Sequence, residues 1–374
     1  MTTALSSAAL DSLADQAGRA AGAAHEHRRL PAELAEAVSA SGFTRHFVPE
    51  RWGGEEGTFT EFARAGAGLA EECASTAWCA ALYAAHGRLA AYLPEDGQRD
   101  LWGRSPDVRI AAAVMPPAGR AVAEGDGWSL SGEWAFASGI DHAHWVLLAG
   151  RTGAGEERTV RVFAVPRHEF EVLDTWDSTG LRGTGSNTVR VKDVLVPSHR
   201  SLTLVELAHI DPDRARCHRV PYLSVAGIQF LAPALGAARR ARQAWIGDMS
   251  ARCRADGRPA HTTATAQQVL TRASAEIHAA ELLLGEAARR ADEDPVTPSA
   301  VAENVRDFSV AAELCGAAVG RLVRAAGARA LTGSSPLYRA WQDVCVATGH
   351  ASLGFEAASS HYAQAVLPAA GTEA

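Results

Sequence analysis

The spacing of apolar residues changes twice along the 374-residue chain, and this change constrains the fold more than any single motif. Through residues 4–104, apolar side chains recur at the i, i+3, i+4 spacing of amphipathic helices. Between about 109 and 202 they form short runs separated by glycine and proline, which is typical of strands. From about 203 the helical spacing returns and continues almost to the end of the chain.

This order predicts a mainly α protein with a central antiparallel β domain. We expect an N-terminal helical domain over residues 1–106, the β domain over 107–202 and a C-terminal four-helix bundle over 203–374. Within the last part, glycine and proline separate the predicted helices, which cover 223–254, 262–291, 298–330 and 336–366.

Composition excludes several classes of protein. The chain has 21% charged residues and a formal net charge of -7, which argues against a nucleic-acid partner. Its six cysteines form no CxxC pair, as expected of reduced thiols in a cytoplasmic protein. No apolar run reaches the roughly 18 residues needed to span a bilayer, and MTTALSSAALDSLADQ lacks the basic start of a signal peptide. We expect a cytoplasmic protein without a membrane partner.

Motifs for several cofactors are absent from the sequence. No GxGxxG follows a strand and no GxxxxGK[ST] is present, so no NAD(P) or nucleoside triphosphate site is predicted. GxSxG and HExxH are absent as well. Asp141-His142-Ala143-His144 has no second cluster at the spacing of a metal site, so we predict no metal.

The segment over residues 130–145, LSGEWAFASGIDHAHW, stands out within the β region. Aromatic side chains alternate there with small or polar ones, which is typical of a strand with one buried face: Trp128, Trp134, Phe136 and Trp145. Residues 137–139 (Ala-Ser-Gly) leave so little side-chain volume that a flat ligand can lie against the backbone. The alternative is an ordinary strand and turn in a tryptophan-rich core.

The order of these segments resembles the acyl-CoA dehydrogenase fold and, more narrowly, the oxygenase components of two-component, reduced-flavin-dependent monooxygenases. The resemblance rests on ECASTAWCAALYAAHGRL in the first helical part, on GEWAFASGIDHAHW and GLRGTGSNTVRVKDVLVP in the β part, and on SPLYRAWQDVCVATGH in the bundle. Within that group, HFVPERWGGEEGTF, AAYLPEDGQ and RGTGSNT are most similar to hydroxylases of aromatic polyketide (pyranonaphthoquinone-type) antibiotic pathways. The resemblance also implies a homotetramer.

Two departures separate the chain from the dehydrogenases of this fold. The commonest of those enzymes carry a catalytic glutamate in a Y-E-G triplet shortly after the position of Asp343, where this chain has Gly349-His350-Ala351. Glu356 lies too far along to be the same group. The R-x-x-F-G element that holds the adenine half of FAD is reduced here to Arg258, in Arg258-Pro259-Ala260-His261. This difference favours FMN, bound as FMNH2, with FAD as the alternative.

The resemblance implies roles for particular residues. Reduced flavin adds O2 at its C4a carbon, and the hydroperoxide must be kept from losing H2O2 until it meets a phenolic substrate. Ser138 is implied as the hydroxyl near flavin N5; the alternative is a turn serine. The residues implied to bind cofactor are Trp78, Met115, Pro116, Ala137, Ser138, Gly139 and Arg258. Those expected to contact substrate are Trp134, Phe136, Arg182 and Thr184.

Activation of a phenol needs a base with a pKa near neutrality, which is the range of histidine. The family pattern points to His86 and His350 as the catalytic candidates, and leaves open which of them is the base. Each has the alternative of a core histidine with satisfied hydrogen bonds. Likewise, Arg182 either orients a substrate oxygen or forms a surface ion pair, and the glycine-rich loop at 180–187 either lines the substrate mouth or is a plain hairpin.

These observations predict an FMNH2- and O2-dependent monooxygenase that hydroxylates an aromatic, polyketide-derived phenol or quinol. Because no nicotinamide site is visible, a separate flavin reductase is expected to supply the reduced flavin. One alternative is an N-oxygenase of an amine or amino sugar that uses the same flavin chemistry. Another is an acyl-CoA dehydrogenase-like or non-catalytic flavin-binding protein of the same fold.

Overall fold

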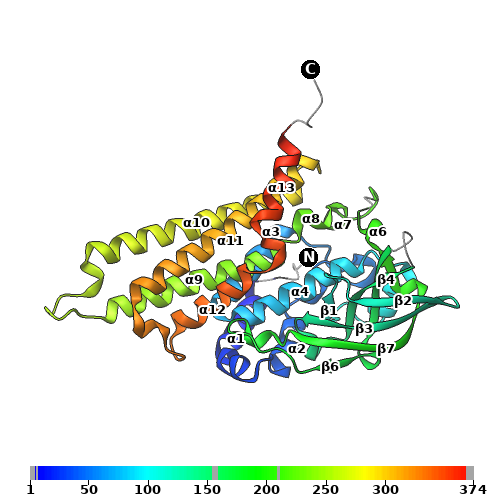
Figure 1. Ribbon diagram of the computed structural model, residues 1–374, viewed down its shortest axis with the longest axis horizontal. Helices are drawn as coiled ribbons and strands as arrows, with labels where there is room; N and C mark the ends of the chain where they lie inside the picture. Colours follow the sequence, from blue (N-terminus) through cyan, green and yellow to red (C-terminus); the bar gives the residue numbers. More distant parts are fainter. Residues whose placement is uncertain (1–4, 6, 154–158, 209–210, 368–374) are drawn as a thin grey trace, which may run out of the picture. The chain divides into compact units, whose positions relative to one another are not determined.

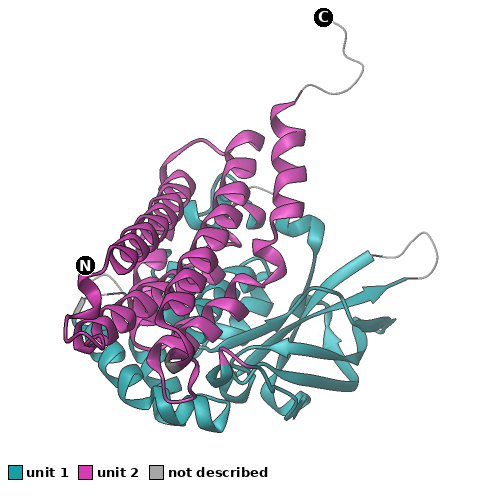
Figure 2. Ribbon diagram, turned by 60° about the vertical axis from the view of Figure 1, so that its left-hand side comes forward, with its two compact units in different colours: residues 1–58, 78–178, 182–222 teal, residues 59–77, 179–181, 223–374 magenta. Residues whose placement is uncertain are grey.

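A sheet with its flanking helices forms one unit and long helices form another in the computed structural model, which describes residues 5, 7–153, 159–208 and 211–367 (Figure 2). Unit 1 comprises residues 1–58, 78–178 and 182–222. Unit 2 comprises residues 59–77, 179–181 and 223–374. The mainly helical fold with a central sheet is confirmed, but the helices before the sheet do not form a unit of their own. None of the described helices is long and apolar enough to cross a membrane.

The helices of unit 1 begin and end at residues that the sequence marks. Pro31 precedes α2 with φ −58° and ψ 148°, and Gly42 follows it with φ +95°, a conformation that favours glycine. The helices before the sheet are α1 (Ser7–His27), α2 (Ala32–Ala40), α4 (Ala74–Ala90, in unit 1 from Trp78 onward) and α5 (Glu95–Trp102). Three short helices follow the sheet: α6 (Leu204–Ala208) and α7 (Arg216–Arg219) lie in unit 1, which includes only the first residue of α8 (Tyr222–Val225).

The described strands form one mixed sheet in the order β6-β7-β3-β2-β4-β5-β8, with β1 also paired to β4 (Figure 1). Their bounds are β1 (Ile110–Ala113), β2 (Gly119–Glu124), β3 (Gly127–Ala137), β4 (Trp145–Thr152), β5 (Thr159–Pro166), β6 (Glu171–Leu173), β7 (Asn187–Pro197) and β8 (Ser201–Thr203). Both β1 and β2 run parallel to β4, so the expected wholly antiparallel sheet is corrected. The β2–β3 hairpin separates β1 from β4 in the chain and serves as the crossover that a parallel pair requires.

Apolar side chains cover both faces of this sheet. On one face, α4 and α5 contribute Leu89 and Trp102 to a cluster that includes Ile110 and Leu147 of β1 and β4. The other face holds a second cluster, which includes Leu130, Trp134, Phe163 and Val189. The sheet is therefore buried on both sides where α4 meets it.

The 130–145 segment is two strands and a turn. β3 ends at Ala137, Gly139 adopts φ +71°, and the short helix η3 (Ile140–His142) leads into β4. The pairing of β3 with β7 shifts register between Trp134 and Ala137, and Phe136 has φ +64° in that interval. This irregularity turns the Phe136 side chain outward, where it is 73% exposed.

Unit 2 is a helical bundle. Its helices are α3 (Phe59–Glu72), α9 (Ile228–Ala251), α10 (Ala264–Glu293), α11 (Pro298–Ala326), α12 (Pro336–Thr348) and α13 (Phe355–Val366). The N-cap hydroxyls of Thr263, Thr297 and Ser335 each accept a backbone N–H from the first turn of α10, α11 and α12. At Gly236, a Cβ would lie 2.1 Å from the carbonyl oxygen of Ala67, so α3 and α9 pack backbone to backbone.

The predicted single helix over 336–366 is wrong, because it is two helices. Gly349 ends α12 and His350 is extended, with φ −67° and ψ 135°. A short turn, η10 (Ala351–Leu353), then leads into α13. The apolar period continues across this break, which is why the spacing alone did not reveal it. Together with α3, the bundle has more helices than the four expected.

Candidate active site

A chain of hydrogen bonds joins four side chains of unit 1 around Ser138. The hydroxyl of Ser138, only 7% exposed, accepts the indole N–H of Trp78 at 3.1 Å. Its Oγ lies 2.7 Å from the Oγ of Ser186, which in turn lies 2.7 Å from the Oγ1 of Thr184. All four residues are buried. We call this chain of side chains the hydroxyl relay.

The backbone around Ser138 is held against α4. The N–H of Gly139 donates to the carbonyl of Thr184 at 2.8 Å, and the carbonyl of Gly139 accepts the hydroxyl of Tyr83 at 2.6 Å. A Cβ at position 139 would lie 2.6 Å from the Tyr83 hydroxyl oxygen, and the positive φ also favours glycine. Position 139 therefore requires glycine, and its tight turn fixes where the Ser138 side chain stands.

The glycine-rich loop leading into β7 is fixed by Asn187 and Asp141. The Asn187 side-chain oxygen accepts the N–H groups of Thr175 and Trp176, each at 3.0 Å, while its amide donates to the Asp141 carboxylate at 3.2 Å. A Cβ at Gly185 would lie 2.2 Å from that carboxylate. Burial raises the pKa of Asp141. This arrangement is a structural support, and it is what brings Ser186 to Ser138.

Ser186 is the residue that the sequence analysis missed. A serine in RGTGSN has the composition of a turn, and no local pattern distinguishes it from one. The available signal was the pairing of β3 with β7, in which Ala137 lies opposite Asn187. That register places the residues next to each, Ser138 and Ser186, side by side.

Two predicted cofactor contacts are exposed apolar groups. Met115 is 72% exposed, and Pro116 beside it is exposed as well. Phe136 packs edge-on against Trp176, with ring centroids 6.3 Å apart. The backbone of fully buried Ala137 joins this exposed ring to Ser138.

Trp134, by contrast, is a core residue and not a substrate wall. It is 1% exposed, and its indole N–H donates to the carbonyl of Ala149 at 2.7 Å. A Cβ at Gly119 or Gly132 would lie 2.0 or 2.8 Å from its ring. The indole thus fills the space that two glycines leave open, and Trp134 is not part of the candidate site.

Arg182 and Thr184 also have structural partners. The Arg182 guanidinium donates to the carbonyls of His25 at 3.2 Å and Ser178 at 2.8 Å, and lies 3.4 Å from the Asp177 carboxylate. This corresponds to the structural alternative stated for Arg182, since its donors tie the loop to the end of α1. Thr184 is 2% exposed and belongs to the hydroxyl relay, so its place is behind Ser138 and not at a substrate surface.

His86 lies on α4 and is buried. Its Nδ1 lies 2.9 Å from the carbonyl oxygen of Ile110, and because a carbonyl only accepts, Nδ1 carries the proton. Burial lowers the pKa of His86 to about 4. The neutral ring therefore has its lone pair on Nε2, but its pKa lies below the near-neutral range that the sequence argument required of a base.

His350, in unit 2, is held in the opposite way. It is the N-cap of η10, and its Nδ1 accepts the N–H of Ser352 at 3.2 Å, so the neutral ring carries its proton on Nε2. The ring stacks on Phe230, with centroids 3.7 Å apart. Loss of hydration lowers the pKa of His350 to about 4 as well.

Asp343, which the sequence marked only as part of the family pattern, has a defined contact within unit 2. Its carboxylate accepts the N–H of Leu181 at 2.6 Å, and a Cβ at Gly180 would lie 2.0 Å from the carbonyl oxygen of Gln342. Desolvation raises the pKa of Asp343 to about 6. The start of the glycine-rich loop is thereby bound to α12.

Arg258 lies on an exposed loop between α9 and α10 in unit 2. The loop is closed by a backbone hydrogen bond from Arg254 to the carbonyl of Arg258 at 2.9 Å, and the Arg258 N–H donates to Asp256 at 3.1 Å. Its proposed contact with the adenine half of a cofactor stays a prediction.

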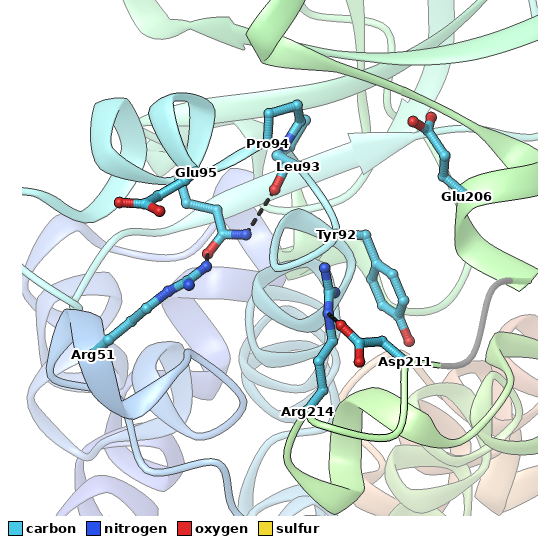
Figure 3. A pocket seen from close by; sticks show the side chains of 9 residues that line it. Arg51, Tyr92, Leu93, Pro94, Glu95, Glu206, Asp211 and Arg214 are labelled. Atoms are coloured by element: carbon cyan, nitrogen blue, oxygen red, sulfur yellow. Dashed lines mark hydrogen bonds and ion pairs between the residues drawn. The ribbon is translucent and has the colours of Figure 1, made fainter.

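A cavity of about 320 Å³ in unit 1 lies elsewhere (Figure 3). Gln98 accepts from Arg51 at 2.8 Å and donates to the carbonyl of Leu93 at 2.7 Å. The lining residues are Arg51, Tyr92, Leu93, Pro94, Glu95, Gln98, Glu206, Asp211 and Arg214. Acidic and basic groups are mixed there, and none of the predicted site residues is among them. Across the described residues, no group of three or more metal-ligating side chains occurs.

The residues around Ser138 fit the edge of a flavin. A serine hydroxyl has one hydrogen and two lone pairs, and Trp78 and Ser186 occupy two of these three functions. One function remains for a ligand. Two residues earlier in the chain, the exposed ring of Phe136 offers an apolar surface to a flat heterocycle. This remaining function is what a ring nitrogen of the cofactor requires.

Sequence comparisons extend over most of the chain. Residues 228–355 match the family described as acyl-CoA dehydrogenase, C-terminal domain. The chain is 32% identical over 343 residues to the flavin-dependent monooxygenase oxygenase subunit HsaA of Rhodococcus jostii (strain RHA1), covering 87% of this chain and 88% of the relative. It is also 32% identical over 368 residues to the oxygenase component of the FADH(2)-dependent resorcinol hydroxylase of Rhizobium sp. (strain MTP-10005), covering 91% and 89%.

A comparison with solved structures gives the same picture. XiaF from Streptomyces sp., solved in complex with FADH2 and glycerol, superposes with a TM-score of 0.89 at 25% identity, covering 96% of each chain.

Proposed function

Because the chain belongs to the oxygenase components of two-component flavin-dependent monooxygenases, which share the acyl-CoA dehydrogenase-like fold, we propose that it hydroxylates a phenol or quinol ring with reduced flavin and O2. The observation that carries the proposal is the open hydrogen-bonding function of the Ser138 hydroxyl, two residues after the exposed ring of Phe136. When bound, the cofactor would supply the activation of O2. A separate reductase delivers the reduced flavin.

Each residue of the site then has a role that its surroundings support. The Ser138 hydroxyl would hold the cofactor by a hydrogen bond to N5, which would retain the hydrogen that otherwise leaves with peroxide. Phe136 and Met115 offer the apolar surface that keeps water from the reacting edge. Gly139 permits the tight turn that would let the backbone approach the ring of the cofactor.

The two histidines offer different hydrogen-bonding groups at Nε2. The Nε2 of His86 is a hydrogen-bond acceptor, and the Nε2 of His350 is a donor. We propose that His86, in unit 1, takes the hydrogen bond of the substrate hydroxyl, and we keep His350, in unit 2, as the alternative catalytic candidate.

The finer assignments follow the sequence resemblance. We propose an aromatic polyketide of an antibiotic pathway as the substrate, FMN in preference to FAD, a homotetramer and a cytoplasmic location. That a relative is named as a resorcinol hydroxylase supports a phenolic ring. The N-oxygenase, dehydrogenase-like and non-catalytic alternatives are not favoured, because these relatives are named as a monooxygenase and a hydroxylase.

The direct test supplies purified protein with FMNH2 or FADH2, ¹⁸O2 and a panel of phenols and naphthohydroquinones, resorcinol included. We expect one ¹⁸O atom in the product, detected by mass spectrometry, and no oxidation of NAD(P)H by the protein alone. Ser138→Ala should shift at least about tenfold more of the consumed O2 to H2O2, since a buried hydrogen bond to a charged or reacting group contributes about 1.5–3 kcal/mol. Ser12→Ala, at an exposed position on α1, is the matched control. An unaltered H2O2 yield in Ser138→Ala, or NAD(P)H oxidation by the protein alone, would contradict the proposal.

A further inference from the structure

The hydroxyl relay restricts what Ser138 can offer to a ligand. The indole N–H of Trp78 is only a donor, so it occupies one lone pair of the Ser138 oxygen. What remains is one hydrogen and one lone pair. Of these, the contact with Ser186 at 2.7 Å uses one and leaves the other for the ligand. The direction of the Ser138–Ser186 bond therefore decides whether the site presents an acceptor or a donor.

Ser186 has one hydrogen and two close hydroxyl neighbours. If that hydrogen points to Thr184, Ser186 accepts the hydrogen of Ser138, and Ser138 keeps a lone pair for the ligand. If Ser186 instead donates to Ser138, then Thr184 must donate to Ser186, and Ser138 turns its own hydrogen to the ligand. The three hydroxyls are thus coupled, and each direction suits one kind of ligand atom.

The two redox states of a flavin differ at this point. Reduced flavin carries N5–H, a donor, and oxidised flavin has a bare N5, an acceptor. We propose that Ser186 is a positioning residue that accepts the Ser138 hydrogen, holds Ser138 as an acceptor, and thereby gives the site its preference for reduced over oxidised flavin. The inference rests on the proposed function and deepens it, since an oxygenase fed by a separate reductase must select the reduced cofactor.

Ser186→Ala tests this preference. Without the Ser186 hydroxyl as acceptor, the Ser138 hydrogen turns toward the ligand. This disfavours reduced flavin, which carries N5–H, and favours oxidised flavin, whose N5 accepts a hydrogen bond. We expect the ratio of the Kd for FMN to the Kd for FMNH2 to fall about fivefold, as the loss of one hydrogen bond implies. For a two-electron couple, this equals a fall of about 20 mV in the potential of bound flavin. Anaerobic titrations with both forms and a potentiometric titration measure it.

A second variant and a control make the outcome decisive. Thr184→Val removes the hydroxyl that accepts the Ser186 hydrogen, so the Ser186 hydrogen turns to Ser138. The ratio of the Kd for FMN to the Kd for FMNH2 should then fall, as in Ser186→Ala. This variant provides the test if Ser186→Ala does not fold. Trp78→Phe removes a donor to Ser138 and should weaken binding without shifting preference toward the oxidised form.

The possible failures are distinguishable. A role of Ser186 in packing alone would weaken both forms equally and leave the ratio unchanged, and that result overturns the inference. If the wild-type protein hydroxylates a phenol while the ratio stays constant in Ser186→Ala and Thr184→Val, only the inference fails. If the wild-type protein does not bind FMNH2, the proposed function fails with it.

Discussion

His86 on α4 and His350 between α12 and α13 are the same residue type held by opposite backbone groups. The Nδ1 of His86 donates to a carbonyl, that of Ile110, whereas the Nδ1 of His350 accepts an amide N–H, that of Ser352. Burial lowers the pKa of each to about 4, so both rings are neutral at neutral pH. They are neutral in different tautomers.

The difference teaches that the backbone assigns the chemistry of a histidine. With Nδ1 protonated, His86 presents a lone pair at Nε2, as a base requires. With Nδ1 accepting, His350 presents an N–H at Nε2, which stabilises negative charge but cannot take a proton. The sequence named both as candidates for the base, and only the hydrogen bonds to the main chain separate them.

The largest expected effect on the unfolding free energy comes from replacing His86 or His350 by aspartate, whose carboxylate only accepts hydrogen bonds. His86→Asp puts a carboxylate beside the Ile110 carbonyl in a buried site and should cost about 3–5 kcal/mol of unfolding free energy relative to His86→Asn, whose amide can donate. His350→Asp keeps an acceptor for the Ser352 N–H at an N-cap, so it should differ from His350→Asn by less than about 1 kcal/mol. Urea unfolding of the four variants measures both differences. Equal differences at the two positions would break the comparison.

The lowered pKa that His86 and His350 share should make the unfolding free energy depend on pH in acid. Their folded pKa of about 4 lies below the usual 6.5, so on acidification the unfolded chain binds the proton first. The unfolding free energy should therefore fall as pH decreases from about 6.5 to 4, by at most about 3 kcal/mol per histidine. His86→Asn and His350→Asn should each remove part of this slope in urea unfolding measured across pH.

Two further variants serve as references for that pH series. His168→Asn changes a side chain that is 79% exposed and serves as the matched control. Asp343 acts in the opposite direction: its folded pKa of about 6 lies above the usual 3.8, so it adds stability as pH falls from about 6 to 4. Asp343→Asn should then make the acid loss steeper. A series in which neither histidine variant alters the slope would contradict the lowered pKa values.

The smallest expected effect concerns the ring that covers His350. Phe230→Leu removes the stacked aromatic ring and admits water, so the pKa of His350 should rise by less than about one unit. His86, whose Nδ1 donates to the Ile110 carbonyl, should titrate as before. NMR titration of ¹⁵N-labelled histidine follows both rings and also reports which nitrogen is protonated. A finding of the same tautomer in both would remove the basis of the comparison.

The order of helices and strands was predictable because apolar spacing records it directly. The helix caps at Thr263, Thr297 and Ser335 follow from residue type, and so does the neighbourhood of Ser138, whose small residues mark a close approach. The break at residues 349–354 was not predictable from spacing, since apolar residues keep their period across it. The parallel pairing with β4 was also hidden, because pairing partners lie far apart in the chain.

Site residues were predictable only where the neighbouring sequence marks them, and not where contacts with distant residues place them. Ser186 needs the β3–β7 register to come beside Ser138, and a serine in a glycine-rich loop carries no sign of it. Arg182 was open to either interpretation, because the carbonyls that it contacts belong to distant residues. The sequence of a strand does not show whether an aromatic side chain points into the core or toward a ligand. For this reason Trp134 was expected to contact the substrate.

The two glycines packed against Trp134 also limit how this sheet can evolve. A methyl group at Gly119 or Gly132 would overlap the indole, whereas a smaller side chain at position 134 would leave a void between the strands. Substitutions at these three positions are therefore contingent on one another: a glycine can change only after the tryptophan has been replaced by something smaller. Related proteins with a larger residue than glycine at position 119 or 132 should therefore have a smaller residue than tryptophan at position 134. The effects of substitutions at these three positions are epistatic.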